Sequence, residues 1–132
     1  MQTILMFTVA LHVLSGIFWA GSTFVLARIG SAGAQQLGRP QMGAAAVAVL
    51  TGGILWSLVH AHSLQPQEQI LALGAGCAII AAGVQGAAAG RLRLAHANAA
   101  QAPIQGSVTL PHRIAAALLA VTVICMASAR YV

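Results

Sequence analysis

Four long runs of apolar residues, separated by short polar stretches, dominate the chain. The runs cover approximately residues 3–28, 42–64, 67–90 and 111–131. A helix needs about 20 mostly apolar residues to cross the ~30 Å hydrocarbon core of a bilayer, and each run reaches that length. A helix also satisfies its own backbone in lipid, whereas a single strand does not. We therefore predict an all-α fold, an integral membrane four-helix bundle that forms a single transmembrane domain over residues 1–132.

Residues that break or cap helices separate the runs. Residues 30–40 are rich in Gly, Ser and Gln and predict a loop. Pro66 suits the first turn of a helix, and Glu68 is placed to meet the positive end of that helix. Because the connection before Pro66 is short, we expect the second and third helices to be antiparallel neighbours. The only long connection is predicted at residues 91–110.

Composition agrees with a lipid environment. The chain is 59% hydrophobic and 5% charged, whereas soluble domains carry roughly 25% charged residues. Its net charge is +5, but its arginines are spread thinly between apolar runs and form no basic stripe. We therefore expect the lipid bilayer as the partner of this surface and no binding of nucleic acid.

The arginines also predict an orientation. Arg130 falls on one side of the predicted bundle, and five arginines fall on the other. These five are Arg28, Arg39, Arg91, Arg93 and Arg113. The excess of positive charge on cytoplasmic loops makes their side cytoplasmic, and residues 91–110 then form a cytoplasmic loop. The chain is thus predicted in a bacterial inner membrane, with both termini on the outer, periplasmic side.

His12 is the most informative polar residue. It lies roughly 10 Å inside the predicted outer end of the first helix, and ionisable residues at such depth are costly enough to indicate function. Gly16 and Trp19 follow on the same helical face. Gly16 would leave room for a flat macrocycle beside the imidazole, and Trp19 would wall the pocket. The alternative is an imidazole hydrogen-bonded to another helix, which holds the bundle together.

The second helix carries a comparable arrangement. His60 is preceded by Trp56 one turn deeper and by Gly53 two turns deeper. We therefore predict haem b with His12 and His60 as metal ligands, although His60 is shallower by ~5–6 Å along the helix axes. Two imidazole ligands suit electron transfer. Arg130, at the outer end of the last helix, is placed to pair with a haem propionate.

Two further groups of residues are candidates for other chemistry. His12, Cys77 and Cys125 lie at similar predicted depths, and imidazole with soft sulfur ligands favours copper. His112 and Arg113 begin the last helix on the cytoplasmic side. For them we expect contact with lipid phosphate, with a quinone headgroup or a second cofactor as the alternatives.

Small residues predict close helix packing. A smooth face on the third helix is formed by Ala78, Ala82, Gly83, Gly86 and Gly90. Such residues let helices approach closely in lipid. They favour a tight bundle, or a surface that docks on other membrane subunits or on a second copy of the chain.

The segment from His12 to Gly21 reads HVLSGIFWAG and is followed by Phe24. It resembles the first helix of a group of bacterial membrane proteins that includes the copper-resistance protein D family and the membrane-bound protoporphyrinogen oxidase. The segment from His112 to Tyr131 is similar to the last helix of this group. The resemblance implies a four-helix unit with haem b on the first-helix histidine, here His12. The oxidase also relies on a lysine, and this chain has none.

Three functions follow as expectations. The first is a haem b protein in electron transfer, or an accessory subunit of a membrane redox complex, with a quinone or a cytochrome as partner. The second is a cofactor-free structural subunit, and the third is the handling or transport of copper or another metal. The sequence has no nucleophile–base pair, phosphate loop or Rossmann signature. An independent enzyme is therefore not expected, and a subunit of an oxidoreductase stays open.

Overall fold

The computed structural model describes residues 2–59, 65–97 and 106–132, and these residues are helical almost throughout. The elements are α1 (Gln2–Ile29), α2 (Ser31–Val59), α3 (Pro66–Ala97), α4 (Gly106–Ser128) and the 3-10 turn η1 (Ala129–Tyr131). Four helical segments, the last of which continues from α4 through η1, are long and apolar enough to cross a membrane. These segments are Gln2–Ile29, Gln36–Val59, Pro66–Leu94 and Thr109–Tyr131. The predicted all-α, four-helix architecture is confirmed.

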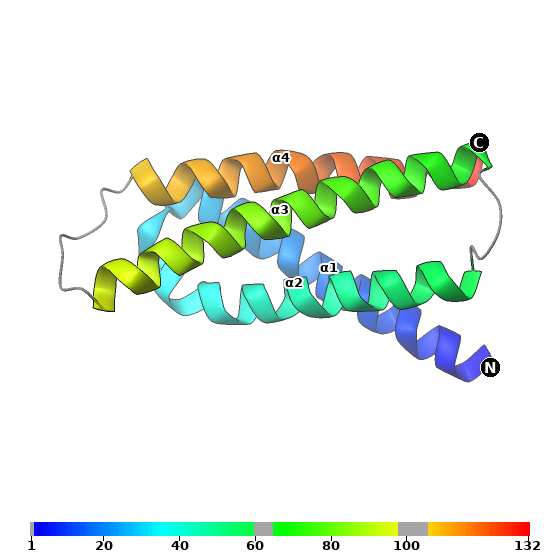
Figure 1. Ribbon diagram of the computed structural model, residues 1–132, viewed down its shortest axis with the longest axis horizontal. Coiled ribbons are helices and arrows are strands. Elements are labelled where there is room, and N and C mark those ends of the chain that lie inside the picture. Colours follow the sequence, from blue (N-terminus) through cyan, green and yellow to red (C-terminus); the bar gives the residue numbers. More distant parts are fainter. Residues whose placement is uncertain (1, 60–64, 98–105) are drawn as a thin grey trace.

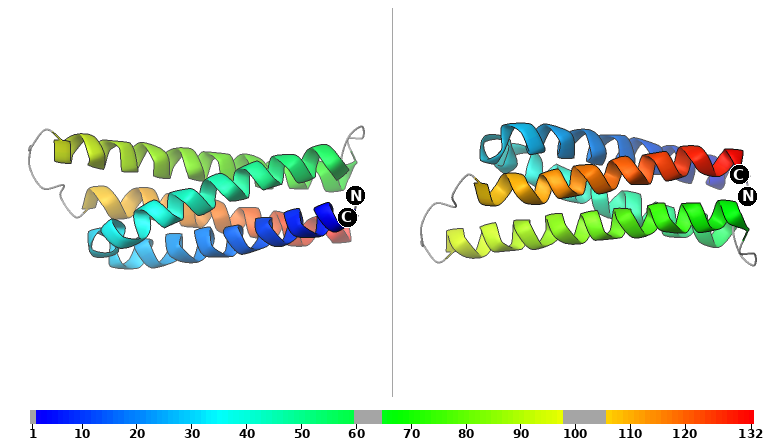
Figure 2. Two further views of the ribbon diagram at one scale, coloured as in Figure 1. Left: turned by 90° about the horizontal axis from the view of Figure 1, so that it is seen from below. Right: turned by 90° about the horizontal axis from the view of Figure 1, so that it is seen from above.

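The helices pack as two antiparallel hairpins. α1 lies closely along α2, and α3 lies closely along α4 (Figures 1 and 2). The two hairpins meet mainly through α1 and α4. Both chain termini lie at the same end of the bundle, where α2 ends and α3 begins (Figure 1). α2 and α3 are thus the antiparallel neighbours that we expected, but they make the slightest contact of the four neighbouring pairs.

The connection between α1 and α2 differs from the prediction. We expected a loop over residues 30–40, whereas α2 begins at Ser31 and contains Pro40. Only Gly30 separates the two helices. Its φ of 64° lies in the left-handed region, which glycine enters without a side-chain clash. Its N–H donates to Leu26 O at 2.9 Å and closes α1. The stretch after Gly30 is therefore helical, and its polar composition did not require a loop.

The ends of α3 and α4 follow the prediction in part. Pro66 is the first residue of α3, and Glu68 Oε2 accepts a hydrogen bond from the Gln65 N–H at 3.3 Å, as expected of an acid in the first turn. Helix extends into both ends of the predicted loop at 91–110, because α3 continues to Ala97 and α4 begins at Gly106. Helical hydrogen bonds therefore continue beyond the apolar runs on this side.

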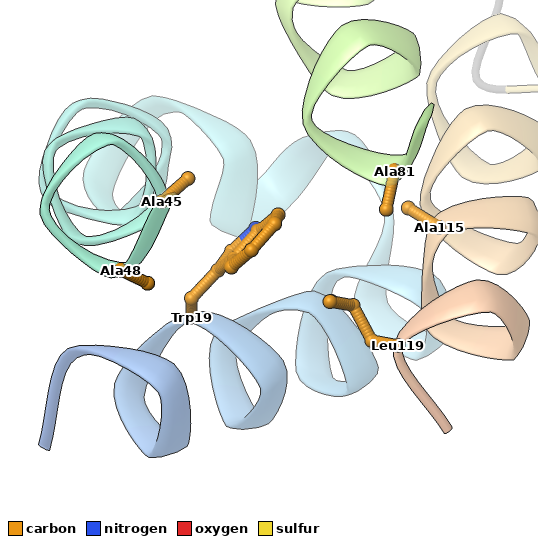
Figure 3. Packing of buried hydrophobic residues seen from close by; sticks show 6 residues of the cluster. All are labelled: Trp19, Ala45, Ala48, Ala81, Ala115 and Leu119. Carbon is orange, nitrogen blue, oxygen red and sulfur yellow. The ribbon is translucent and has the colours of Figure 1, made fainter. Parts of the chain in front are cut away.

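The core consists of one tryptophan and small residues. Trp19 is 3% exposed, and Figure 3 shows its indole between two alanines of α2 and residues of α3 and α4. The residues packed with it are Ala45, Ala48, Ala81, Ala115 and Leu119. Large apolar side chains such as Phe7, Leu14 and Ile17 point outward instead. A bundle with small residues inside and large apolar residues outside suits an apolar environment.

The small residues of α3 serve mainly the bundle itself. Ala78 and Ala82 pack against the core, and a Cβ on Gly86 would lie 3.7 Å from Met42 Cε. Gly83 is exposed. Closer contact occurs at Gly74, outside the face that we predicted. A Cβ on Gly74 would lie 3.0 Å from Cys125 Cβ, so the glycine allows α3 and α4 to approach each other.

Candidate functional site

His12 lies half-buried on α1 and turns its imidazole toward α2. Its Nδ1 lies 2.9 Å from Ala48 O and 3.0 Å from Thr51 Oγ1. A carbonyl oxygen only accepts hydrogen bonds, so Nδ1 carries the proton and donates it. The Thr51 hydroxyl donates its own hydrogen to Val47 O at 2.6 Å. Its oxygen can therefore accept from Nδ1 as well, and both contacts require the same tautomer.

This tautomer leaves a lone pair on the other ring nitrogen. A neutral imidazole carries one proton, so with Nδ1 protonated Nε2 is an acceptor or a metal ligand. Within the described residues, Nε2 has no hydrogen-bond partner. Metal-binding histidines generally donate their second ring N–H to a carbonyl or a carboxylate, which orients the ring. The His12 geometry matches that arrangement, and it is also an interhelical hydrogen bond in its own right.

Gly52 allows this close approach. A Cβ at Gly52 would lie 3.1 Å from His12 Cε1 and 3.6 Å from Nδ1, so the ring lies directly against the α2 backbone. No sequence pattern indicated Ala48, Thr51 or Gly52 as neighbours of His12. A backbone carbonyl and a glycine leave no pattern in the sequence, and the register of two helices is a property of the packed bundle.

The two glycines predicted to leave room for a macrocycle have open surroundings. A Cβ on Gly16 or on Gly53 would meet nothing within 4 Å. Gly16 is half-buried and Gly53 is exposed. Trp56, the predicted wall on α2, is 38% exposed. These positions are compatible with a flat group beside the bundle, and their role as cofactor contacts stays a prediction.

Trp19 has different surroundings. Its ring is enclosed by the core residues, and its Nε1–H donates to Gln85 Oε1 at 2.6 Å. The indole therefore fills the interior of the bundle and joins α1 to α3. In this arrangement Trp19 serves packing, and no open side of the ring is offered to a cofactor.

His60 lies outside the described residues, so its pairing with His12 stays a prediction. The part of α2 that contacts His12 spans residues 48–52. Val59, the last described residue of α2, lies seven residues past Gly52, or roughly 10 Å farther along the helix axis. Along the helix axis, the described end of α2 is thus farther from the imidazole than the ~5–6 Å that we expected between His12 and His60.

Arg130 is exposed at the end of the bundle where the chain termini lie. Its guanidinium carbon lies 5.5 Å from the centre of the Tyr131 ring, within the range of a cation–π contact. Its pairing with a propionate stays a prediction.

The residues considered for copper do not gather. Among the residues that the structure describes, there is no group of three or more His, Cys, Asp or Glu side chains that could hold a metal ion. His12, Cys77 and Cys125 all lie in that part of the chain. These three residues form no such group, and a copper site stays a prediction.

His112 corrects another expectation. We expected it to contact lipid phosphate, but its side chain is only 8% exposed, while Arg113 beside it is exposed. Successive residues of a helix point about 100° apart, so the start of α4 turns one residue inward and the next outward. His112 faces the interior of the bundle.

A buried hydrogen-bond network lies next to the core, and only part of it was predictable from the sequence. Thr23 Oγ1 donates to Trp19 O at 2.7 Å and accepts from Gln41 Nε2 and Gln85 Nε2, each at 2.8 Å. Trp19 lay on the predicted face of the first helix, and Thr23 follows it by one turn. Gln41 was hidden because it followed the predicted loop directly. Gln85 is a lone amide within an apolar run, which was a signal for an interhelical hydrogen bond.

Comparison with known proteins adds no relative. No family model, curated protein or solved structure matches the chain. The resemblance to the copper-resistance protein D and protoporphyrinogen oxidase group stays a prediction.

Proposed function

We propose that this chain is a haem b-binding, multi-pass protein of a bacterial inner membrane. It would act in electron transfer or as an accessory subunit of a membrane redox complex. The observation that carries the proposal is the tautomer of His12. Its Nδ1–H is held by Ala48 O and Thr51 Oγ1, which leaves the lone pair of Nε2 for a metal.

The surface of the bundle supports placement in a membrane. Most of its large apolar side chains point outward, and all six arginines are exposed. Five of them lie within about three turns of the end where α1 meets α2. By the positive-inside rule that end is cytoplasmic, and the two chain termini are periplasmic.

The residues around His12 fit a haem in part. His12 would ligate the iron, and Gly16 and Gly53 would leave space for the edge of the macrocycle. When bound, the haem would supply one-electron redox chemistry. The role of the protein is to fix the imidazole, which the two contacts of Nδ1 do, and to shield it from water. His12 lies only half-buried at one side of the bundle, so a partner subunit or a second copy would complete the shielding. His60 and Arg130 are the candidates for the second ligand and the propionate partner.

The test is a visible spectrum of the protein purified in mild detergent with haem available. We expect reduced-minus-oxidised bands of haem b, which His12→Gln abolishes. Glutamine can still donate to Ala48 O but is a poor iron ligand, so this variant separates ligation from packing. In His12→Gly, added imidazole should restore the bands. A colourless wild-type protein, or bands that persist in both variants, would contradict the proposal.

The second candidate is a cofactor-free structural subunit. The hydrogen bonds of His12 favour this function as well, because the bonds to Ala48 and Thr51 join α1 to α2 without any ligand. This function predicts a colourless protein that co-purifies with one fixed membrane partner. It also predicts that His12→Gln keeps the partner bound.

A further inference from the structure

Each of the four helices contributes one buried polar side chain to a layer beside the core. The members of this polar layer are Thr23, Gln41, Gln85 and His112. In α1 and α3 the layer lies four residues after the core residues Trp19 and Ala81. In α2 and α4 it lies four residues before Ala45 and three residues before Ala115. Because neighbouring helices are antiparallel, all four residues are shifted from the core in the same direction. The shift is about one helical turn toward the end of the bundle where α1 meets α2 and where five of the arginines lie.

The hydrogen bonds within the polar layer fix the orientation of both amides. The Thr23 hydroxyl gives its hydrogen to Trp19 O, so its oxygen can only accept. Both amide nitrogens therefore face Thr23, as observed. The carbonyl of Gln85 in turn accepts the Trp19 Nε1–H. With the nitrogen of Gln41 held by Thr23, its carbonyl oxygen must point elsewhere.

The side-chain carbonyl oxygen of Gln41 is the unpaired acceptor of this network. Gln41 is 1% exposed, and its Oε1 has no hydrogen-bond partner within residues 2–59, 65–97 and 106–132. Buried amide oxygens are normally paired, because a missing partner leaves the cost of desolvation uncompensated. Each of the two amide nitrogens also keeps a second N–H. One acceptor and two donors thus lie close together, since both nitrogens are bound to the same Thr23 oxygen.

We propose that the polar layer binds a small O–H donor, which donates to Gln41 Oε1 and accepts from a second amide N–H. Two sources share this chemistry, an internal water molecule and the hydroxyl of a lipid-soluble hydroquinone. A buried water typically makes about three hydrogen bonds to groups that would otherwise be unpaired, and the polar layer offers that set. The site is separate from His12 and does not depend on haem.

The test uses the full-length wild-type protein with ¹⁵N-labelled glutamine in nanodiscs free of quinone. We expect a cross-peak between the side-chain amide protons of Gln41 and a long-lived bound water, which Gln41→Met removes. If no such peak appears, tetramethylhydroquinone is added, and a saturable shift of the Gln41 amide signal would identify the hydroxyl as the ligand. Absence of both signals overturns the proposal.

A stability measurement gives a second readout. In a Thr23→Val background, Gln41 has already lost its bond to the threonine. Gln41→Met then removes mainly the carbonyl and the second N–H. We expect it to lower the melting temperature further if an O–H donor is bound. An unpaired carbonyl would instead make the exchange for an apolar side chain neutral or stabilising, and a melting temperature that stays the same or rises contradicts the proposal.

Discussion

Trp19 and His12 of α1 both form hydrogen bonds to neighbouring helices, but they differ in whether a hydrogen-bonding group stays unused. Trp19 donates its single N–H to Gln85 and is otherwise surrounded by alanines and a leucine, so its bonding capacity is used up. His12 donates its Nδ1–H to Ala48 O of α2, and within the described residues the lone pair of Nε2 has no partner. Both contacts join helices, but only the histidine retains a group that can bind something else. A polar residue in an apolar helix therefore suggests chemistry when its hydrogen bonds are incomplete.

The two contacts also differ in burial, and therefore in their expected contribution to stability. Trp19 is enclosed by three other helices, whereas His12 is half-buried between α1 and α2. Removing a buried aromatic ring loses both its contacts and the space that it fills. Changes at Trp19 should therefore affect stability, and changes near His12 should affect mainly the orientation of the imidazole. The following variants test this division, from the largest expected effect to the smallest.

Trp19→Ala should lower the free energy of unfolding by about 3–5 kcal/mol, because it opens a cavity and leaves Gln85 without its donor. Unfolding in detergent by titration with a denaturing surfactant measures this. Phe18→Ala is the matched control, since Phe18 is the exposed neighbour on the same helix. Equal losses in the two variants would show that Trp19 does not hold the core.

Gln85→Leu should cost about 1–3 kcal/mol, because it leaves the Trp19 N–H buried without a partner and removes a donor from Thr23. The same unfolding titration applies. Gln69→Leu on α3 is the control, because Gln69 is exposed and should change stability by a few tenths of a kcal/mol at most. A neutral Gln85→Leu would argue that the contact between the hairpins contributes little.

Gly52→Ala should displace the imidazole, because the new Cβ would lie 3.1 Å from His12 Cε1. The gain of roughly 1 kcal/mol from alanine in a helix would offset much of this strain, so the net change in stability is small. The histidine signals in an NMR spectrum should nevertheless shift. Gly43→Ala is the control, since nothing lies within 4 Å of its added Cβ; it should stabilise α2 and leave those signals in place. Equal shifts in both variants would contradict the close contact.

Thr51→Val should disturb the imidazole least and should cost about 0.6 kcal/mol, which is the average for a hydrogen bond between helices in a membrane. Ala48 O remains as an acceptor, so the tautomer of His12 is kept. Thr8→Val is the control, because the Thr8 hydroxyl bonds only within α1, to Ile4 O at 2.8 Å. A loss of several kcal/mol at Thr51 would show that the hydroxyl, and not the carbonyl, holds the imidazole.

Only part of the candidate site could be predicted from the sequence. His12 was recognisable because an ionisable residue in an apolar run is costly. Its partners were not, because Ala48 contributes a backbone carbonyl and Gly52 contributes the absence of a side chain. Trp19 was correctly placed on the same helix face, but its ring lies in the core of the bundle, and a role beside a cofactor stays a prediction. His12 and Trp19 share one face of α1 but lie two turns apart. His12 therefore bonds to α2, whereas Trp19 bonds to Gln85 of α3.

The amino-acid sequence alone determined the number of helices and their apolar character, since both follow from the length of uninterrupted hydrophobic runs. It also determined the start of α3, because proline and an acid act locally. Only the tertiary structure decided that α1 and α2 are separated by Gly30 alone, and that Gln41, Gln85 and His112 face inward. The physical reason is that the side of a helix that is buried depends on its rotation against its neighbours. When nearly every residue of a helix is apolar, the sequence contains little periodicity to specify that rotation.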